Sequence, residues 1–240
     1  MTINGATYNN VLPSGNTWSI DTGLITASSG TFSPLVNGTY SVTATIRDAS
    51  GNTTSDLTSN ELTIDTTAPL TVPSVTALVT NDLTPTIAGT ATLGIGETLN
   101  VTVNGATYTN VRVTSGAWSL DTGAVSPTSG TLGVFSNGSY NVVATVIDAA
   151  GNTASDNTFG ELTIDTTPPT NVATVDTLTT SNLTPLITGS ANLAAGETLD
   201  VLINGAAYNN VLVEAGAPSV TLLHCILNYP TPQENANIGQ

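Results

Sequence analysis

Apolar and polar residues alternate with a period of two in several short segments of the chain. In residues 140–147 the alternation places two sets on opposite faces: Tyr140, Val142, Ala144 and Val146 on one, and Asn141, Val143, Thr145 and Ile147 on the other. Residues 99–103 alternate in the same way and end at Asn104-Gly105, a two-residue hairpin signal because both residues tolerate positive φ. A period of two is that of a strand with one buried face, so the pattern predicts β-strands.

The strand pattern returns after 100 residues without insertions. The segment Asn-Gly-Ala-Thr-Tyr at 4–8 occurs again at 104–108 and, with one change, at 204–208. Glu-Leu-Thr-Ile-Asp-Thr-Thr-Ala-Pro at 61–69 occurs again at 161–169 with Pro in place of Ala. The sequence therefore predicts tandem copies of one module.

The Thr-Thr-X-Pro segment that ends each copy cannot continue a sheet, because proline lacks the backbone donor, and we place the module boundary there. The boundary gives a complete repeat at 67–166. It also gives a partial repeat at 1–66 that lacks its first strands and a partial repeat at 167–216 that lacks its last strands. Met1 then falls in mid-strand, so we expect the sequence to be a piece of a longer protein.

The last residues, 217–240, do not follow the repeat. Pro218 stands where Trp118 predicts a tryptophan, and the only His and the only Cys of the chain lie here, at His224 and Cys225. Adjacent residues of a strand point to opposite faces, so this pair is not expected to form a metal or nucleophile site. We expect a non-repeat tail that is frameshifted or disordered.

Each repeat is expected to hold about seven short strands rich in Thr and Val, separated by Gly, Asn, Asp and Pro, with no segment of helical period. This predicts an all-β protein of tandem immunoglobulin-like β-sandwich repeats of 100 residues. Trp118 is then the expected central core residue. Tyr140, at the start of the penultimate strand, is a candidate for the corner tyrosine of such folds.

The strongly negative net charge of the chain restricts the kinds of molecule that it is expected to bind. The chain has 17 acidic residues against 2 basic ones and a net charge of −15. Binding to nucleic acid depends on Lys and Arg, so nucleic acid is excluded as an expected partner, and anionic membranes are disfavoured for the same reason. No run of 18 apolar residues predicts membrane insertion. An acidic surface attracts cations instead.

Strand order predicts that carboxylates gather at one end of the complete repeat. In an antiparallel sandwich of seven strands, the turns after the second and sixth strands lie at the end where the chain enters. These turns hold Glu97, and Asp148 with Asn152, while Asp65 arrives there from the preceding repeat. Close carboxylates repel unless a cation neutralises them, and calcium takes oxygen ligands without needing His or Cys.

The equivalent junction into the third repeat uses Asp165 and Glu197. A purely structural interpretation stays open at this point. Asp148 before Gly151-Asn152 is also good turn chemistry, because an Asp side chain accepts hydrogen bonds from backbone groups two residues on. Glu97 is equally compatible with a solvated loop carboxylate.

Four motifs stand out: Asp-Ala-Ala-Gly-Asn-Thr at 148–153, Leu-Thr-Ile-Asp-Thr-Thr-Pro-Pro at 162–169, Thr-Pro-Thr-Ile-Ala-Gly-Thr-Ala at 84–91 and Gly-Glu-Thr-Leu-Asn-Val-Thr-Val-Asn-Gly at 96–105. Together they resemble the bacterial Ig-like repeats of large, calcium-dependent surface adhesins. Those adhesins are biofilm-associated and secreted by the type I route. The resemblance covers residues 1–216. It implies an extracellular, cell-surface extender in cell adhesion, stiffened by calcium between neighbouring repeats of one parent chain. It also implies that Asp48, Asp65, Asp148 and Asp165 inherit the calcium role.

A carbohydrate- or protein-binding Ig-like module is the alternative, because loops of this fold can hold ligands. An enzyme is not expected, since the repeats contain no His and no nucleophile with a base. Head-to-tail self-association is a further expectation, in which residues 167–200 supply to another molecule the strands that residues 1–66 lack.

Overall fold

The computed structural model describes residues 1–213, so the expected tail at 217–240 lies outside the described residues. The chain divides into two compact units, Met1–Thr166 and Thr167–Gln240, and each is described by itself. The described residues form strands and no helix, which confirms the all-β prediction. Accordingly, none of them belongs to a helix that could cross a membrane.

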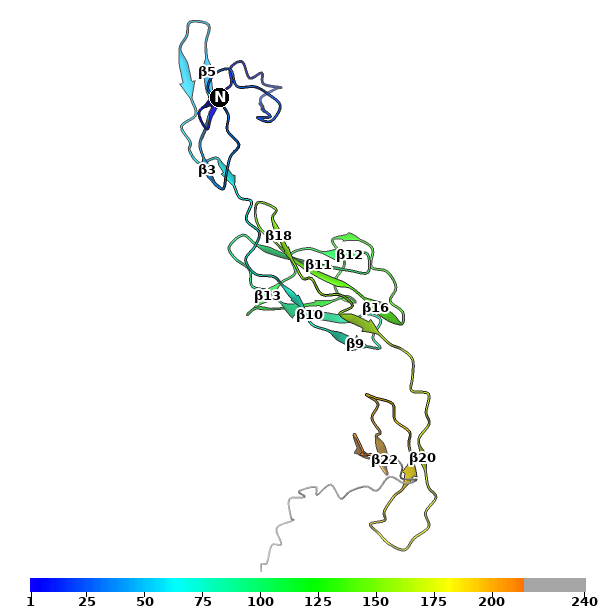
Figure 1. Ribbon diagram of the computed structural model, residues 1–240. Coiled ribbons are helices and arrows are strands. Elements are labelled where there is room, and N and C mark those ends of the chain that lie inside the picture. The colour runs from blue at the N-terminus through cyan, green and yellow to red at the C-terminus, as the bar shows by residue number, and fades with distance from the viewer. Residues whose placement is uncertain (214–240) are drawn as a thin grey trace, which may run out of the picture. The chain divides into compact units, whose positions relative to one another are not determined.

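Three sheets, two of them larger, form the middle repeat of the first unit (Figure 1). One sheet has the order β13-β14-β10-β8, formed by β8 (Ser74–Val75), β10 (Thr86–Thr90), β13 (Val113–Thr114) and β14 (Ala117–Asp121). The other has the order β15-β12-β11-β17-β18, formed by β11 (Thr98–Val103), β12 (Ala106–Tyr108), β15 (Ser129–Gly130), β17 (Val142–Ile147) and β18 (Thr153–Ser155). The strands β9 (Leu78–Thr80), β16 (Gly138–Tyr140) and β19 (Leu162–Ile164) form a third group, in which β19 pairs with β9 in parallel.

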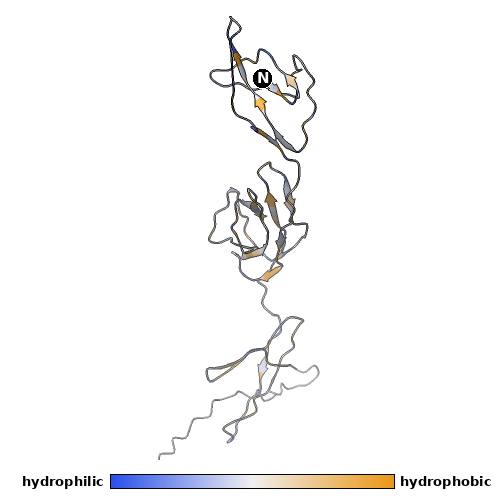
Figure 2. Cartoon of the chain, turned by 90° about the vertical axis from the view of Figure 1, so that its left-hand side faces the viewer, coloured by the Kyte–Doolittle hydropathy of each residue, from blue (hydrophilic) through white to orange (hydrophobic). Residues whose placement is uncertain are grey.

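The core of the middle repeat comes from the inward positions of both sheets. In β11 and β17 alternate residues are buried, as the period of two predicts. Figure 2 shows that strands of the middle repeat carry hydrophobic residues, coloured orange. Trp118 on β14 is 2% exposed, and its Nε1 donates a hydrogen bond to the backbone oxygen of Ser74 at 3.2 Å. The prediction that Trp118 is a core residue is confirmed.

Two local predictions are confirmed as well. Asn104 and Gly105, between β11 and β12, both have positive φ, 45° and 87°, as the two-residue hairpin requires. The hydroxyl of Tyr140 donates to the backbone oxygen of Ser136 at 3.0 Å and accepts from its backbone nitrogen at 2.9 Å. Tyr140 is therefore a corner tyrosine that holds the turn before β16.

Residues 1–66 form smaller sheets: β1 (Thr2–Ile3), β2 (Ala6–Thr7) and β4 (Val42–Thr43) in one, β3 (Gly38–Tyr40) with β7 (Leu62–Ile64) in the second, and β5 (Thr45–Arg47) with β6 (Thr53–Ser55) in the third. Trp18, the counterpart of Trp118, is 47% exposed. Trp118 is covered because β14 pairs with β10. No described strand plays the part of β10 for Trp18, so the same side chain stays open to solvent.

The described part of the second unit has two short two-stranded sheets: β20 (Thr174–Val175) with β21 (Gly189–Ser190), and β22 (Val201–Ile203) with β23 (Ala206–Tyr208). The registers repeat those of the middle repeat, 100 residues on. Its apolar side chains are only partly buried, because the described residues hold no counterpart of β14, β17 or β19.

Candidate functional site

The segment that follows β7 is held by an asparagine from a distant turn. The side-chain oxygen of Asn37 accepts hydrogen bonds from the backbone nitrogen and the hydroxyl of Thr66, at 3.0 and 2.7 Å. The Asn37 amide donates to the hydroxyl of Thr67 at 2.7 Å, and the backbone nitrogen of Thr67 donates to Asp65 at 2.9 Å. The chain therefore leaves β7 along a defined path, with Asp65 at its start.

The same arrangement occurs at the end of the middle repeat. The side-chain oxygen of Asn137 accepts from the backbone nitrogen and hydroxyl of Thr166, at 2.9 and 2.6 Å. This role was not predicted from the sequence, because Asn-Gly is turn-forming by itself and does not indicate a bond to a distant segment. The signal was the constant spacing of 29 residues between the Asn and the Thr in both copies.

The turn after β17 lies beside the segment that follows β7 and lines the same cleft. Oδ1 of Asp148 accepts from the backbone nitrogens of Ala150 and Asn152, at 2.8 and 2.9 Å, and Oδ2 accepts from the Asn152 amide at 2.8 Å. That amide also donates to the backbone oxygen of Asp65 at 3.1 Å, across 87 residues of sequence. Asn152 thus joins the turn directly to the incoming chain.

The turn before β11 also lines this cleft. Oε2 of Glu97 accepts a hydrogen bond from the backbone nitrogen of Gly94 at 2.7 Å. Gly96, with φ +81°, occupies a backbone conformation that favours glycine, and this tight turn places the Glu97 carboxylate on the same side as Asp148.

Asp65, Glu97 and Asp148 line one cleft of about 390 Å³ together with Thr67, Pro69, Ile95 and neighbouring residues. The structure thus brings together the three carboxylates that strand order placed at this end. It does not draw them into a tight cluster: within residues 1–213 no three Asp, Glu, His or Cys side chains lie close enough to hold a metal ion together. The cleft is an acidic recess without a preformed coordination shell.

A comparison with protein families matches the part of the chain that holds Glu97 and Asp148. Residues 74–166 match the family model of a bacterial Ig-like domain. These residues form a bacterial Ig-like domain. Such domains are generally structural modules rather than enzymes, and they are typical of exported surface proteins. A search of curated proteins found no significant match to the chain.

The Ig-like domain supplies two of the three carboxylates, and the chain before it supplies Asp65. The groups of the recess that could bind a cation are therefore carboxylate oxygen atoms. The Asn152 amide and neighbouring backbone N–H groups hold the pKa of Asp148 below its usual range, against the opposing effect of burial, so the carboxylate is ionised at neutral pH. A carboxylate offers about four lone-pair sites, so these hydrogen bonds leave acceptor capacity for a hard cation.

The other predicted ligands lie elsewhere. Asp48 caps its own turn as Asp148 does, accepting from the backbone nitrogens of Ser50 and Asn52 at 2.9 and 2.8 Å. This is the turn chemistry that the structural interpretation describes. Asp165 follows β19, and its backbone nitrogen donates to Thr80 at 2.9 Å. Glu197, in the second unit, accepts from the backbone nitrogen of Ala194 at 2.7 Å, as Glu97 does from Gly94.

A buried carboxylate of the Ig-like domain lies away from the recess. Glu161 is 6% exposed, and its Oε2 accepts from the backbone nitrogen of Val142 at 3.1 Å, while Oε1 is buried without a hydrogen-bond partner. Burial acts to raise the pKa of Glu161, but hydrogen bonds from Thr158 and Val142 outweigh it and the pKa is lowered. The ionised carboxylate of Glu161, which directly precedes β19, therefore stabilises the contact of this segment with β17.

We expect acid to weaken the Ig-like domain partly through Glu161. A carboxylate whose pKa is lower in the folded state contributes its stability above the unfolded pKa and loses it as pH falls through the folded pKa, here below about pH 4. Glu161→Gln should therefore lose less stability than the unaltered chain between pH 6 and pH 3, measured by urea unfolding. Glu61→Gln is the matched comparison: the pKa of Glu61 is also lowered, first by the same bond from Val42, but its carboxylate is exposed, so we expect a smaller change in the acid response because solvent screens the interaction. An equal acid response in the Glu161→Gln variant and the unaltered chain would contradict the assignment.

Proposed function

We propose that this chain is a non-catalytic extender segment of a bacterial cell-surface adhesin, with junctions between neighbouring repeats made rigid by calcium. The observation that carries the proposal is the shared recess: Asp65 comes from the linking chain, whereas Glu97 and Asp148 come from two turns of the Ig-like domain. A cation held by all three would connect the linking chain to the domain.

The residues present suit calcium better than a transition metal. The recess offers carboxylate oxygens and has no His or Cys ligand, which is the donor set of a hard cation. Bound calcium would supply positive charge in a chain of net charge −15. Its binding would also need the carboxylates to move closer together, which would tighten the segment that Asn37 and Asn152 already hold.

The repeat pattern extends the proposal along the parent protein. Asp165 and Glu197 repeat the positions of Asp65 and Glu97, and Asp48 repeats Asp148. Each junction would then use an aspartate from the outgoing strand and acids from two turns of the next repeat. The partners of this chain in such an assembly are the neighbouring repeats of the same extracellular protein.

Calcium should raise the melting temperature of the chain. At about 10 mM calcium and a Kd near the 10⁻⁴ M of extracellular sites, the added stability is about 2.7 kcal/mol. Asp65→Asn combined with Asp148→Asn should abolish most of this shift. Asp121→Asn is the matched control, because Asp121 caps a turn through Gly123 without lining the recess. The measurement is calorimetry in calcium and in chelator.

The rigidity of the junction between repeats can be measured separately from stability. Small-angle scattering of residues 1–240 should give a narrower distribution of dimensions with calcium than with chelator. Magnesium should be less effective, because it needs near-ideal octahedral geometry and dehydrates reluctantly. Identical melting temperatures and dimensions in calcium and chelator would remove calcium from the proposal.

A further inference from the structure

An early strand and the last strand of the Ig-like domain pair in parallel. The register of β9 with β19 is Leu78↔Leu162, Val79↔Thr163 and Thr80↔Ile164. One backbone bond extends the pairing on each side: the Leu78 nitrogen donates to the Glu161 oxygen at 2.7 Å, and the Asp165 nitrogen donates to the Thr80 oxygen at 2.9 Å. The segment by which the chain enters the domain is therefore bonded directly to the segment by which it leaves.

The parallel direction decides how tension along the chain acts on these bonds. The chain enters β9 at its amino-terminal end and leaves β19 at its carboxyl-terminal end, so tension pulls the two strands in opposite directions along one axis. All the bonds between them are then loaded together. Two strands pulled apart from the same end would instead lose their bonds one after another. Upstream of β9, β8 pairs with β10 at two positions only, so we expect the longer pairing of β9 with β19 to break last.

Side chains fix β19 at both of its ends. Before the strand, Oε2 of Glu161 accepts a hydrogen bond from the backbone nitrogen of Val142 in β17. After the strand, the side-chain oxygen of Asn137 accepts from the backbone nitrogen and the hydroxyl of Thr166. Tension that arrives from the carboxyl-terminal side therefore meets the Asn137 bonds before it reaches the pairing of β9 with β19.

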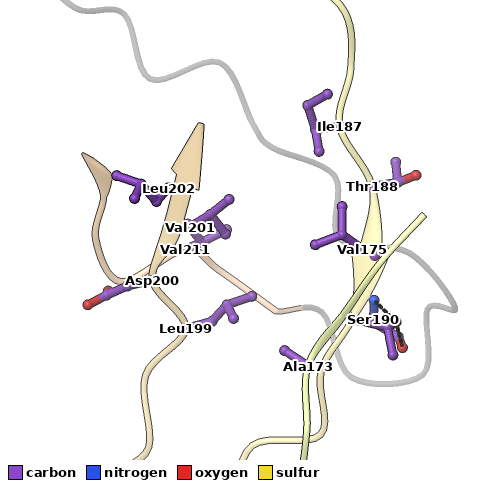
Figure 3. Close-up of a pocket in the computed structure, with 12 residues that line it drawn as sticks. Ala173, Val175, Ile187, Thr188, Ser190, Leu199, Asp200, Val201, Leu202 and Val211 are labelled. Carbon is purple, nitrogen blue, oxygen red and sulfur yellow. Dashed lines mark hydrogen bonds between the residues drawn. The ribbon is translucent and has the colours of Figure 1, made fainter. Parts of the chain in front are cut away.

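Loss of β19 would also open the hydrophobic core. Leu162 and Ile164 of this strand are each 1% exposed. In the second unit, where the described residues hold no counterpart of β14, β17 or β19, Leu199 and Val201 line an open cavity of about 180 Å³ (Figure 3). Their counterparts in the Ig-like domain are 0% exposed. Separation of β19 from β9 is therefore expected to unfold the whole domain rather than one edge of it.

The strand β9 itself depends on the presence of β19. Its counterpart in the second unit, residues 178–180, forms no strand, although β20 and β21 pair there in the register of β8 and β10. Leu178 is 53% exposed, whereas Leu78 packs against the core of the Ig-like domain. The parallel pairing is thus the interaction that orders this segment of the repeat.

We propose that the Ig-like domain has a mechanical function: it resists extension of the chain through the parallel pairing of β9 with β19. The extender role supplies the tension, so in that respect the inference rests on the proposed function. The resistance itself comes from backbone hydrogen bonds and a closed core, and it needs no cation. Under tension that this pairing withstands, the domain keeps its fold and the repeat keeps its length.

Force spectroscopy of the whole chain, tethered at its two ends in the presence of chelator, tests the resistance. We expect one high-force event with a gain in contour length of about 300 Å, since residues 74–166 unfold to about 3.3–3.6 Å per residue. A trace without such an event in chelator would overturn the proposal. That result would leave the calcium proposal standing, because the calcium proposal is tested by the difference between calcium and chelator.

Proline substitutions in β9 test the pairing. Leu78→Pro removes the N–H group that donates to Glu161 and should raise the rate of unfolding at constant force roughly tenfold or more. Leu78→Ala is the control for the lost side chain. Val79→Pro is the matched control for proline, because successive N–H groups alternate in direction and that of Val79 faces the outer edge of the sheet, where proline is tolerated. An effect of Leu78→Pro no larger than that of either control would overturn the proposal.

The direction of pulling gives a test that leaves the pairing unaltered. In a Cys225→Ser background, Phe159→Cys provides an attachment point just before β19, at a side chain that is 81% exposed. Tension between the amino-terminal end of the chain and position 159 acts on the starts of β9 and β19, which lie side by side, so their bonds should break in succession at a much lower force. This comparison decides the question if Leu78→Pro does not fold. Equal unfolding forces in the two directions would overturn the proposal.

Discussion

Trp118→Ala is expected to destabilise the Ig-like domain by about 3–5 kcal/mol, the cost of removing a large aromatic side chain from a packed core. Trp118 is 2% exposed and packs on Gly89 of the neighbouring strand, and its Nε1 bonds to the backbone oxygen of Ser74. The variant therefore leaves a cavity and also removes one hydrogen bond to the Ser74 backbone oxygen. Urea unfolding followed by circular dichroism measures the loss.

The repeat supplies a matched control for this prediction. Trp18 occupies the same position 100 residues earlier, with 47% of its surface exposed. Trp18→Ala should therefore cost about 1 kcal/mol or less, measured in dilute solution so that association does not contribute. Equal losses for the two variants would show that position in the repeat, rather than coverage by β10, determines the cost.

The contrast between the two tryptophans shows what the sequence could predict about the fold. Alternation in residues 140–147 and the Asn104-Gly105 turn are local signals, since a period of two and a positive φ depend on neighbouring residues. Both predictions were confirmed. Coverage is not local: identical residue types at Trp18 and Trp118 lie in different environments because β10 pairs beside Trp118, whereas no strand among the described residues takes that place beside Trp18.

Hydrogen bonds that join distant segments were harder to predict. The bond of Asn152 to the backbone of Asp65 and the bond of Asn137 to Thr166 depend on how two turns meet in space. Sequence spacing indicated turns at these asparagines, because Asn-Gly and Asp-X-X-Gly-Asn are turn-forming by themselves. Their second role, holding the junction, appears only when the chain is folded.

The candidate site was predictable in position and not in detail. Strand order alone placed Asp65, Glu97 and Asp148 at one end, and they line one cleft. Whether the oxygens converge depends on side-chain torsions and on competing donors, which strand order does not determine. In the structure each carboxylate accepts from a backbone N–H of its own turn, which holds it near the cleft while the three remain apart.

Gly89→Ala is the second variant expected to have a large effect. A Cβ at this position would lie 2.0 Å from the backbone oxygen of Ser74 and 2.6 Å from the Trp118 ring, so either a strand or the ring must move. Overpacking of this kind costs roughly 3 kcal/mol. Gly94→Ala is the control, because the atoms nearest its Cβ would be those of the side-chain carboxylate of Glu97, from 3.2 Å, and not backbone atoms. Chemical unfolding followed by circular dichroism measures both.

A double variant separates the two sources of strain at Gly89. If the Trp118 ring is the main obstacle, adding Gly89→Ala to Trp118→Ala should cost much less than Gly89→Ala alone, because the ring is gone and its space can take the methyl group. If the Ser74 backbone is the main obstacle, the two losses should add, since the pairing of β8 with β10 is unchanged. The shorter distance, 2.0 Å to a backbone atom, favours near-additivity. Gly89 would then be required chiefly for the close approach of β8, and the tryptophan would fill the space that this approach leaves.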